Sequence, residues 1–322
     1  MISIVLVTYN RSKFLELAIQ DIMKQTFKNF ELIICDDASP DDTENICKKY
    51  CKIDDRVKYI RQSQNKKMPF NLNTGIRIAK FPYVAILHDG DRFDCTLLEK
   101  WYQGIVNNSQ VAFVFNRLLN FDSDGNYWGE PTYFEEGVLN GKWLLKNFFF
   151  RNFRFASHIW GEVMIRKSCL EEYGYLKQEY GFYADVDLWM GLLQNYDAYY
   201  IDETLIHCPT KDLQPHQFDD RLMKVFFLLK KMNVKQRVVA YRNSKIELFK
   251  ELFIFQSLST YGYTYNLLTV IKNFDFKSYS DAGKITLSNN SPLILIWLIL
   301  SPLKLFISIL QFFKSKKEFV TK

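Results

Sequence analysis

The sequence lacks the cysteine patterns that build metal sites or disulfide frameworks. Its six cysteines form no C-x-x-C pair and have no zinc-finger spacing. Disulfide frameworks are typical of small secreted domains, so in a chain of 322 residues we expect reduced thiols. The segment M-I-S-I-V-L-V-T-Y-N starts directly with an expected strand and shows no basic region followed by an apolar stretch and a small-residue cleavage site. We therefore expect no secretory signal and a cytoplasmic protein.

A large excess of charge of one sign is missing too. The net charge is only +6 and is spread along the chain, apart from a late cluster of Lys314, Lys316 and Lys317. We therefore expect no nucleic-acid partner. No repeat of 20 to 50 residues is visible, which argues against a solenoid. The hydrophobic content of 48% excludes a disordered chain, and the length suggests more than one structural unit.

The first 115 residues alternate between short β-branched segments and segments with helical periodicity. The expected strands are Ile2–Val7, Glu31–Cys35, Val57–Ile60, Tyr83–Leu87 and Val111–Phe115. The expected helices are Ser12–Lys24, Asp41–Tyr50, Leu72–Ala79 and Leu97–Val106. This alternation predicts an α/β fold with a mostly parallel, Rossmann-like sheet and helices on both faces.

Polar residues follow four of the expected strands, at the point where each strand ends. They are Thr8–Arg11, Asp36–Asp42, Arg61–Asn65 and His88–Arg92. Parallel sheets bind ligands at the carboxyl ends of their strands, so the pattern predicts a site at this edge.

Asp89 and Asp91 flank Gly90 directly after a strand that reads as buried. A D-x-D triplet alone is a weak signal, because Asp-Gly pairs are also common in ordinary turns. Mg²⁺ and Mn²⁺, however, bind through one or two carboxylates together with substrate phosphates. The position beside three other polar strand ends favours such a metal site.

Residues 116–215 are less regular. A strand is expected at Ile159–Ile165, followed by a short helix, and Asp185 and Asp187 precede a segment with the pattern of an amphipathic helix. On local pattern alone, these two carboxylates either cap that helix or act as a general base.

Several motifs in order make the chain similar to the family-2 glycosyltransferases, which have the GT-A fold. They are T-Y-N-R after the first strand, Q-T-F-K-N-F-E-L-I-I, D-D-A-S-P-D-D-T, and N-T-G-I-R-I-A-K-F-P-Y-V-A-I-L leading into H-D-G-D. The similarity is close over about the first 110 residues and looser to about residue 210. It implies a nucleotide-sugar-binding half at 1–115 and an acceptor-binding half at 116–215.

The resemblance implies an inverting transfer from a nucleotide diphosphate sugar, with a UDP-sugar favoured and Mn²⁺ or Mg²⁺ on the diphosphate. The residues it places at the nucleotide sugar are Thr8, Tyr9, Asn10, Asp36, Asp37 and Asp89. It makes Asp91 the main metal ligand with Asp89 beside it, and His207 or His216 a possible further ligand.

The segment A-D-V-D-L-W is similar to the family segment that supplies the catalytic base, with Ala184 where a Glu is usual. Asp185 is then the expected base and Asp187 the alternative.

Further residues lie near these motifs without a firm role. His88 either supports the metal site or simply ends a strand, and Lys66 and Lys67 lie near the expected diphosphate. The remaining candidates, all toward the acceptor, are Trp160, Trp189, His158 and Glu162.

Residues 216–322 read as helical, with a strongly apolar tail at about 291–317. Two Ser-Pro-Leu starts, at 291–293 and 301–303, divide the tail into two short helices. A membrane span would place the lysine cluster away from the cytosol, against the positive-inside tendency. We therefore expect the tail to lie on the cytosolic face of the plasma membrane, with a span, a core helix or a homo-oligomer contact as alternatives.

Together these observations predict a membrane-associated glycosyltransferase that acts on a glycan or lipid-linked acceptor in cell-surface polysaccharide synthesis. One alternative is transfer to a polyprenyl phosphate, whose phosphate acceptor needs little help from a base. The other is a catalytically silent scaffold that keeps the fold.

Overall fold

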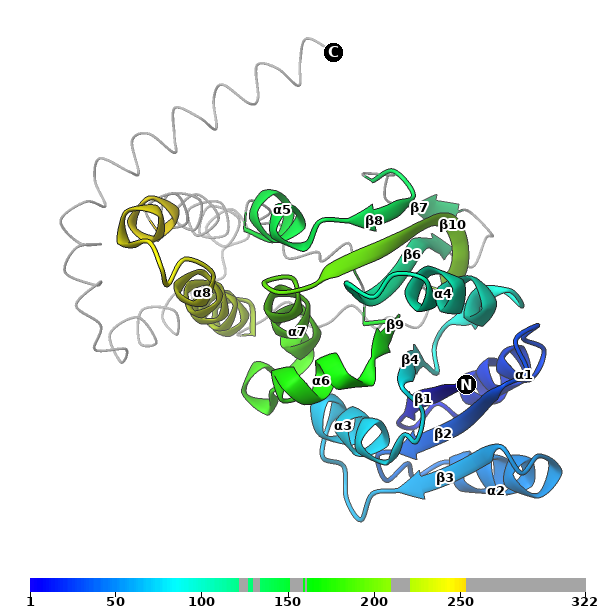
Figure 1. The fold of residues 1–322 in the computed structure, drawn as a ribbon. Helices are drawn as coiled ribbons and strands as arrows, with labels where there is room; N and C mark the ends of the chain where they lie inside the picture. The colour runs from blue at the N-terminus through cyan, green and yellow to red at the C-terminus, as the bar shows by residue number, and fades with distance from the viewer. Residues whose placement is uncertain (122–126, 130–133, 151–158, 160, 210–220, 253–322) are drawn as a thin grey trace, which may run out of the picture. The chain divides into compact units, whose positions relative to one another are not determined.

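The computed structural model describes residues 1–121, 127–129, 134–150, 159, 161–209 and 221–252 (Figure 1). The chain forms two compact units, one of residues 1–146 with 156–214 and one of residues 147–155 with 215–322. The halves expected at 1–115 and 116–215 both contribute strands to one sheet in the first unit.

This sheet is α/β and mostly parallel, as the alternation predicts. Its order is β3 (Val57–Arg61), β2 (Phe30–Asp36), β1 (Ile2–Thr8), β4 (Tyr83–His88), β9 (Val163–Arg166), β6 (Val111–Phe121), β10 (Asp197–Pro209) and β5 (Arg92–Phe93). β3, β2, β1 and β4 are parallel, whereas β9 is antiparallel to both of its neighbours, β4 and β6. β7 (Tyr127–Gly129) pairs with β6, and β8 (Gly137–Leu139) pairs with β10.

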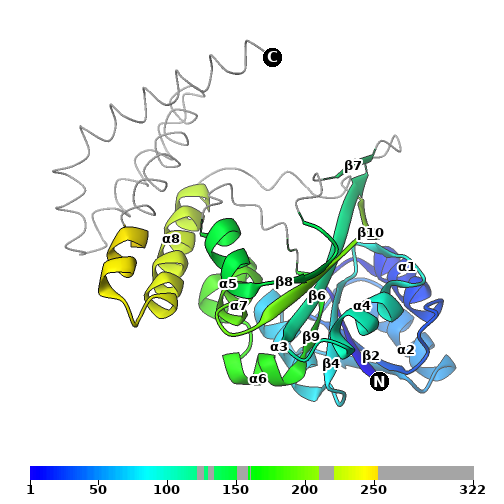
Figure 2. The ribbon, with the colours of Figure 1, turned by 45° about the horizontal axis from the view of Figure 1, so that its top comes forward.

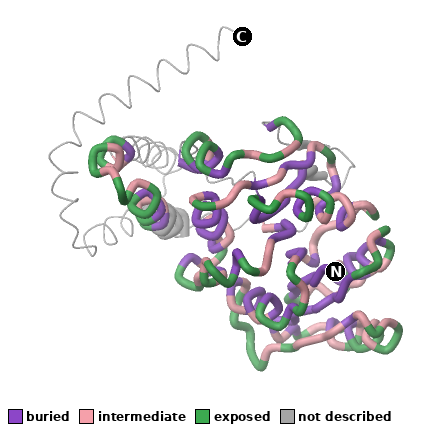
Figure 3. The backbone as a smooth tube through the Cα atoms, viewed as in Figure 1, coloured by how far each residue is buried: buried purple, intermediate pink, exposed green. Residues whose placement is uncertain are grey.

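Helices cover both faces of the sheet (Figure 2). On one face, Ile4 and Leu32 pack in a common core with side chains from α1 (Ser12–Met23), α2 (Thr43–Ile53) and α4 (Leu97–Val106). The opposite face packs against α3 (Met68–Ile78) and α7 (Ala184–Leu192). Burial on both faces explains why the central strands are almost continuously apolar (Figure 3).

The first unit also contains several shorter helical elements between residues 141 and 183. They are α5 (Gly141–Leu144), a π-helical turn (Leu145–Phe149) that runs into the second unit, α6 (Lys167–Tyr173) and a 3₁₀ segment (Gln178–Tyr183). The second unit includes α8 (Arg221–Ala240), in which the buried Arg237 donates from Nη2 to the Phe150 carbonyl at 2.6 Å.

Several elements differ from the sequence expectation, among them β6, which runs to Phe121 instead of ending at Phe115. α3 begins at Met68 because Pro69 fits the first turn of a helix. β9 begins only at Val163. α7 begins at Ala184, so the two carboxylates expected to precede it lie in its first turn.

The amphipathic pattern expected for α7 was wrong. Its residues from Asp187 to Leu192 are all buried, including Trp189, because the helix packs both against the sheet and against α6. A helix enclosed in this way is apolar almost all round.

The N-T-G motif of α3 has a structural reason. Asn73 donates from Nδ2 to the Leu176 carbonyl at 2.7 Å and accepts the Leu176 N–H at 3.2 Å, which fixes the loop before the 3₁₀ segment. A Cβ on Gly75 would stand 2.4 Å from Val5 Cγ1 and 2.7 Å from Cys35 Sγ. Only glycine lets α3 lie this close to β1 and β2.

None of the six cysteines forms a disulfide in the structure. Within the described residues, no helix is long and apolar enough to cross a bilayer. The tail at 291–317, His158, Trp160 and His216 lie outside the described residues.

We expect Gly75→Ala to lower the free energy of unfolding by about 1–3 kcal/mol, because the added methyl group overpacks the α3–sheet contact. Urea denaturation would measure the change. Val5→Ala removes the nearer of the two atoms that the methyl group would meet, so the double variant should be more stable than the sum of the single effects predicts, by about 1 kcal/mol. Strict additivity of the two substitutions would contradict this account.

Candidate active site

The ends of β1 and β2 are joined by hydrogen bonds from one loop to the other. The Asn10 N–H donates to Ser39 Oγ at 2.9 Å, and the Ser12 N–H donates to Asp41 Oδ2 at 2.8 Å. Asn10 and Ala38 have φ angles of 56° and 64°, a left-handed backbone that non-glycine residues rarely adopt. The hydrogen bonds hold this backbone in place and leave Tyr9 45% exposed at the sheet edge.

The side chain of Asp36 is bonded to the protein itself and supports the fold. Its Oδ1 accepts the Ser39 N–H at 2.8 Å, and its Oδ2 accepts from Tyr59 Oη at 2.6 Å and from Arg61 Nη1 at 3.1 Å. The fully buried carboxylate thus ties β2 to β3 and shapes the loop after β2.

Asp37 shapes the loop that enters α3. Its two carboxylate oxygens accept the N–H groups of Lys66 at 2.7 Å and Lys67 at 2.8 Å. Each carboxylate oxygen has a second lone pair, so Asp37 can accept a further hydrogen bond from a ligand. The side chains of Lys66 and Lys67 are exposed.

The D-G-D turn after β4 is braced by Arg11. Arg11 Nη1 lies 3.4 Å from Asp89 Oδ1, and a Cβ on Gly90 would stand 2.6 Å from the same nitrogen. Asp89 Oδ2 is buried and makes no well-formed hydrogen bond to a described residue. Burial raises the pKa of Asp89 to about 6, although Thr8 and Arg11 nearby favour the charged form.

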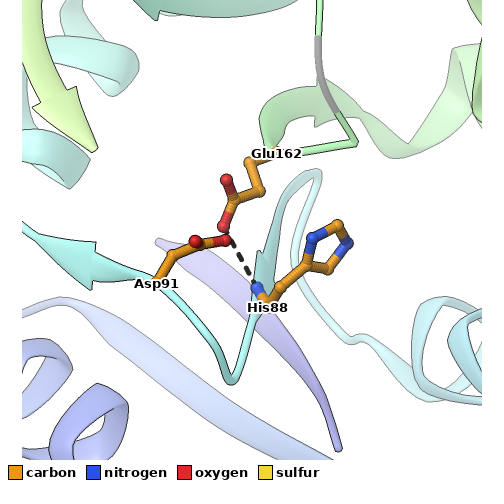
Figure 4. A group of neighbouring side chains, drawn as sticks. All are labelled: His88, Asp91 and Glu162. Atoms are coloured by element: carbon orange, nitrogen blue, oxygen red, sulfur yellow. Dashed lines mark hydrogen bonds between the residues drawn. The ribbon is translucent and has the colours of Figure 1, made fainter. Parts of the chain in front are cut away.

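Asp91, Glu162 and His88 form a cluster beside this turn. Their potential ligand atoms all lie within 4.8 Å of one another. Figure 4 shows the two carboxyl groups turned toward each other, with the His88 ring to one side. Burial and the negative charge of Asp91 raise the pKa of Glu162, whereas burial lowers the pKa of His88 and keeps its ring neutral at pH 7.

Cys208, at the end of β10, lies against the same cluster. Burial, followed by the charges of Glu162 and Asp91, raises the pKa of this thiol, which therefore stays protonated.

The cluster fits a divalent metal. Facing carboxyl groups repel each other when both are ionised, and a bound cation removes that repulsion. Oxygen atoms from Asp91 and Glu162 and a neutral imidazole from His88 form a donor set that a divalent ion can accept.

Asp185 and Asp187 have contrasting surroundings. Asp187 is fully buried, accepts from Tyr173 Oη at 2.7 Å and pairs with Lys177 Nζ at 3.2 Å. The Asp185 side chain accepts the Val186 N–H at Oδ1, at 2.8 Å, and forms no ion pair with a described residue. Burial raises the pKa of Asp185 to about 7, which is close to the range in which a general base works best.

A cavity of about 410 Å³ joins these groups at the carboxyl edge of the sheet. The predicted site residues that line it are Thr8, Tyr9, Asp37, Asp89, Asp91 and Asp185. The structure adds Arg11 and Cys208, which the sequence analysis did not single out, and His88, Glu162 and Trp189, to which it gave no firm role. Trp189 Nε1 is buried without a hydrogen-bond acceptor among the described residues.

Four other predicted residues do not line this cavity. Asn10 and Asp36 shape its walls through the contacts above, and Asp187 pairs with Lys177 instead. His207 lies in β10 opposite Arg92 of β5. The alternation of side chains along β10 therefore gives the cavity Cys208 in place of His207.

Comparison with known sequences shows a match to a protein family that extends over more than half of the chain. The sequence profile of "Glycosyl transferase family 2" matches residues 3–174. The chain is 33% identical over 129 residues to "Glycosyltransferase GlyG" of Streptococcus pneumoniae, which is 40% of this chain and 42% of the relative. It is 30% identical over 199 residues to the "GalNAc(5)-diNAcBac-PP-undecaprenol beta-1,3-glucosyltransferase" of Campylobacter jejuni, which is 62% and 61% of the two chains. The chain thus spans about half the length of these curated relatives.

Solved structures share the fold. The S. aureus TarS fragment 1–349 in complex with UDP-GlcNAc superimposes with a TM-score of 0.60 at 14% identity, over 78% of this chain and 69% of that one. The mannosyltransferase PcManGT of Pyrobaculum calidifontis, in complex with GDP-Man and Mn²⁺, gives a TM-score of 0.51 at 14% identity, over 94% and 80%. The expected GT-A-like fold is confirmed by these similarities.

The raised pKa of Asp185 predicts a pH-dependent cost to stability. The folded-state pKa of about 7 exceeds the ordinary value of 3.8, so the folded state holds a proton that the unfolded state has released. Stability contributed by this group therefore falls as the pH rises from about 4 to about 7. We expect Asp185→Asn to be more stable than the wild type above pH 7 by roughly 1–4 kcal/mol.

Urea denaturation of both proteins at pH 4 to 8, without divalent metal, would measure this difference. The difference should grow with pH and level off above pH 7. A difference that does not change with pH would contradict the proposed environment of Asp185.

Proposed function

Since the chain belongs to glycosyl transferase family 2, as its match over residues 3–174 establishes, we propose that it moves a sugar from a nucleotide diphosphate sugar to a hydroxyl group. The observation that carries the proposal is one cavity that contains both Asp91, from the D-G-D turn, and Asp185, with its raised pKa. Such a cavity offers a place for the donor diphosphate and a base for the acceptor.

The donor nucleotide is assigned to the ends of β1 and β2. Tyr9 is exposed on the cavity wall and can stack on a base, and Thr8 lies beside it. Asp37 has free lone pairs for an N–H group on the edge of the base. We favour uracil because its ring N–H suits a carboxylate acceptor, and the neighbour TarS is described in complex with UDP and UDP-GlcNAc.

The diphosphate is assigned to the D-G-D turn. When bound there, Mn²⁺ or Mg²⁺ neutralises the charge that develops on the leaving diphosphate. Asp91 would hold the metal and Asp89 would face the ribose or the metal, while Arg11 keeps the turn in place through Asp89 and Gly90.

Asp185 is assigned the role of the general base that deprotonates the acceptor hydroxyl. It takes the proton from the acceptor hydroxyl while the oxygen attacks the anomeric carbon and the bond to the diphosphate breaks on the opposite face. The proton ends on the Asp185 carboxylate, and the configuration inverts. An aspartate in water has a pKa near 3.9 and is a weak base, so the burial that raises the pKa of Asp185 strengthens it for this step.

The acceptor is assigned to the class of glycans or lipid-linked sugars in cell-surface polysaccharide synthesis. The Campylobacter relative and the Escherichia coli relative, "UDP-Glc:alpha-D-GlcNAc-diphosphoundecaprenol beta-1,3-glucosyltransferase WfaP", both carry undecaprenol-linked acceptors in their names. WfaP is 30% identical over 140 residues. Such acceptors lie at the membrane, which agrees with the cytosolic membrane association expected from the tail.

Nucleotide binding and donor hydrolysis test the proposed function. In calorimetry, UDP should bind with higher affinity when Mn²⁺ is present, and in a screen of nucleotide sugars at least one UDP-sugar should be hydrolysed slowly without an acceptor. If no nucleotide diphosphate binds in a metal-dependent way, a silent scaffold is favoured and the proposal fails.

A pair of matched variants tests the base. We expect Asp185→Asn to lower kcat by about 10²–10⁴-fold with its fold intact, because only the proton acceptor is lost. Asp187→Asn should lower stability by about 1–3 kcal/mol through its buried contacts and change kcat little.

Initial rates and urea denaturation of both variants would separate the two roles. Full activity in Asp185→Asn would instead favour a phosphate acceptor such as a polyprenyl phosphate, which needs little base.

A further inference from the structure

The geometry points to Glu162 as a second protein ligand of the metal, opposite Asp91. The metal would then be held between the turn after β4 and the residue that precedes β9. This inference deepens the proposed function and rests on it for the role of the metal, although metal binding itself can be measured without any sugar donor.

The first argument is the position of Glu162. β9 is antiparallel to β4, with Val163 opposite Ile86, so the residue before β9 meets the end of β4. There the His88 N–H donates to Glu162 Oε1 at 3.3 Å. The pairing of two strands thus fixes Glu162 beside the D-G-D turn, although it lies far away in the sequence (Figure 4).

The second argument is charge. Glu162 is only 4% exposed, and its potential ligand atom lies within 4.8 Å of one from Asp91. Among the described residues, no Lys or Arg forms an ion pair with either carboxyl group. A buried carboxylate without a cation is costly, and the cost is greater when two of them face each other. A divalent cation between the two oxygens supplies the missing charge.

The third argument is a separate atom on the same cavity. Asp89 Oδ2 is buried in a residue that is 6% exposed, and it makes no well-formed hydrogen bond to a described residue. A buried acceptor of this kind can still bind a ligand, and Asp91 and Glu162 line the same cavity.

The packing around Gly161 holds this arrangement in place. A Cβ at this position would stand 2.8 Å from His88 Cε1 and 3.7 Å from Asp185 Oδ2. The backbone before Glu162 therefore lies between the metal cluster and the proposed base, and a metal ligand at Glu162 would fix the distance between the two halves of the site.

The competing explanation is structural. A protonated Glu162 could donate to Asp91 and accept from the His88 N–H without any metal. Glutamine has the same shape, donates and accepts in the same way, and so preserves that role. Aspartate keeps the charge but is shorter and loses the contact with His88. The two explanations therefore predict opposite orders for these variants.

The experiment is a titration of the wild type, Glu162→Gln and Glu162→Asp with Mn²⁺, followed by the electron paramagnetic resonance signal of the free ion. Each titration is carried out with and without UDP. If Glu162 is a ligand, Glu162→Gln should weaken Mn²⁺ binding by at least about 10-fold, and Glu162→Asp should weaken it less. Glu31→Gln is the control, since Glu31 is a buried glutamate at the opposite end of the sheet that pairs with Lys58. It should bind Mn²⁺ like the wild type.

Two results would overturn the inference. One is equal Mn²⁺ affinity in the wild type and Glu162→Gln, and the other is a wild type that binds no Mn²⁺ with or without UDP. If Glu162→Gln does not fold, as near-ultraviolet circular dichroism would show, Glu162→Asp decides alone. An unchanged Mn²⁺ affinity then overturns the inference, and so does a weaker affinity that comes with a changed circular dichroism spectrum. A weaker affinity with the spectrum of the wild type supports it, because the structural explanation acts only through an altered fold. Failure of donor hydrolysis would affect the proposed function alone, because these titrations contain no sugar donor.

Discussion

The antiparallel pairing of β9 with β4 is the constraint on which the site depends. Without it, the parallel strands β3, β2, β1 and β4 would end in a set of polar loops with no opposing wall. β9 brings Gly161 and Glu162 against His88, and the chain after β9 returns through α6 to α7, which carries Asp185. One strand pairing thus brings the donor edge and the proposed base to the same cavity.

The hydrogen-bond partners of each carboxylate distinguish structural from reactive residues more clearly than residue type does. Asp36 accepts hydrogen bonds at both oxygens and Asp187 pairs with Lys177, so each charge is already stabilised by the protein. Asp89 has the long 3.4 Å contact with Arg11 and Asp185 accepts the Val186 N–H, and burial outweighs these contacts, so that the two pKa values are raised to about 6 and about 7. A carboxylate that the fold leaves poorly satisfied can interact with a ligand.

The sequence predicts those structural features that depend on residues close together along the chain. Strand and helix alternation gives the parallel half of the sheet, and the polar strand ends give Tyr9, Asp37 and the D-G-D turn. It cannot place β9 between β4 and β6, because that order depends on packing between distant segments. Glu162 received no firm role for this reason. The sequence alone does not distinguish the roles of Asp185 and Asp187, because both are aspartates at the start of the same helix. The contacts of Asp187 with Tyr173 and Lys177 distinguish them.

A site of this kind is costly to the fold. Buried carboxyl groups in Asp89, Asp185 and Glu162 all have raised pKa values, so each favours the unfolded state as the pH rises toward neutrality. α3 and α7 each contribute to the cavity wall, through Leu72 and Trp189. The close contact of α3 with β1 at Gly75 and the apolar enclosure of α7 stabilise these two helices on the sheet. The same contacts keep the carboxylates in fixed positions, because a looser wall would let them turn away from one another or take up water. Tight packing around the cavity therefore serves both stability and the geometry of the site.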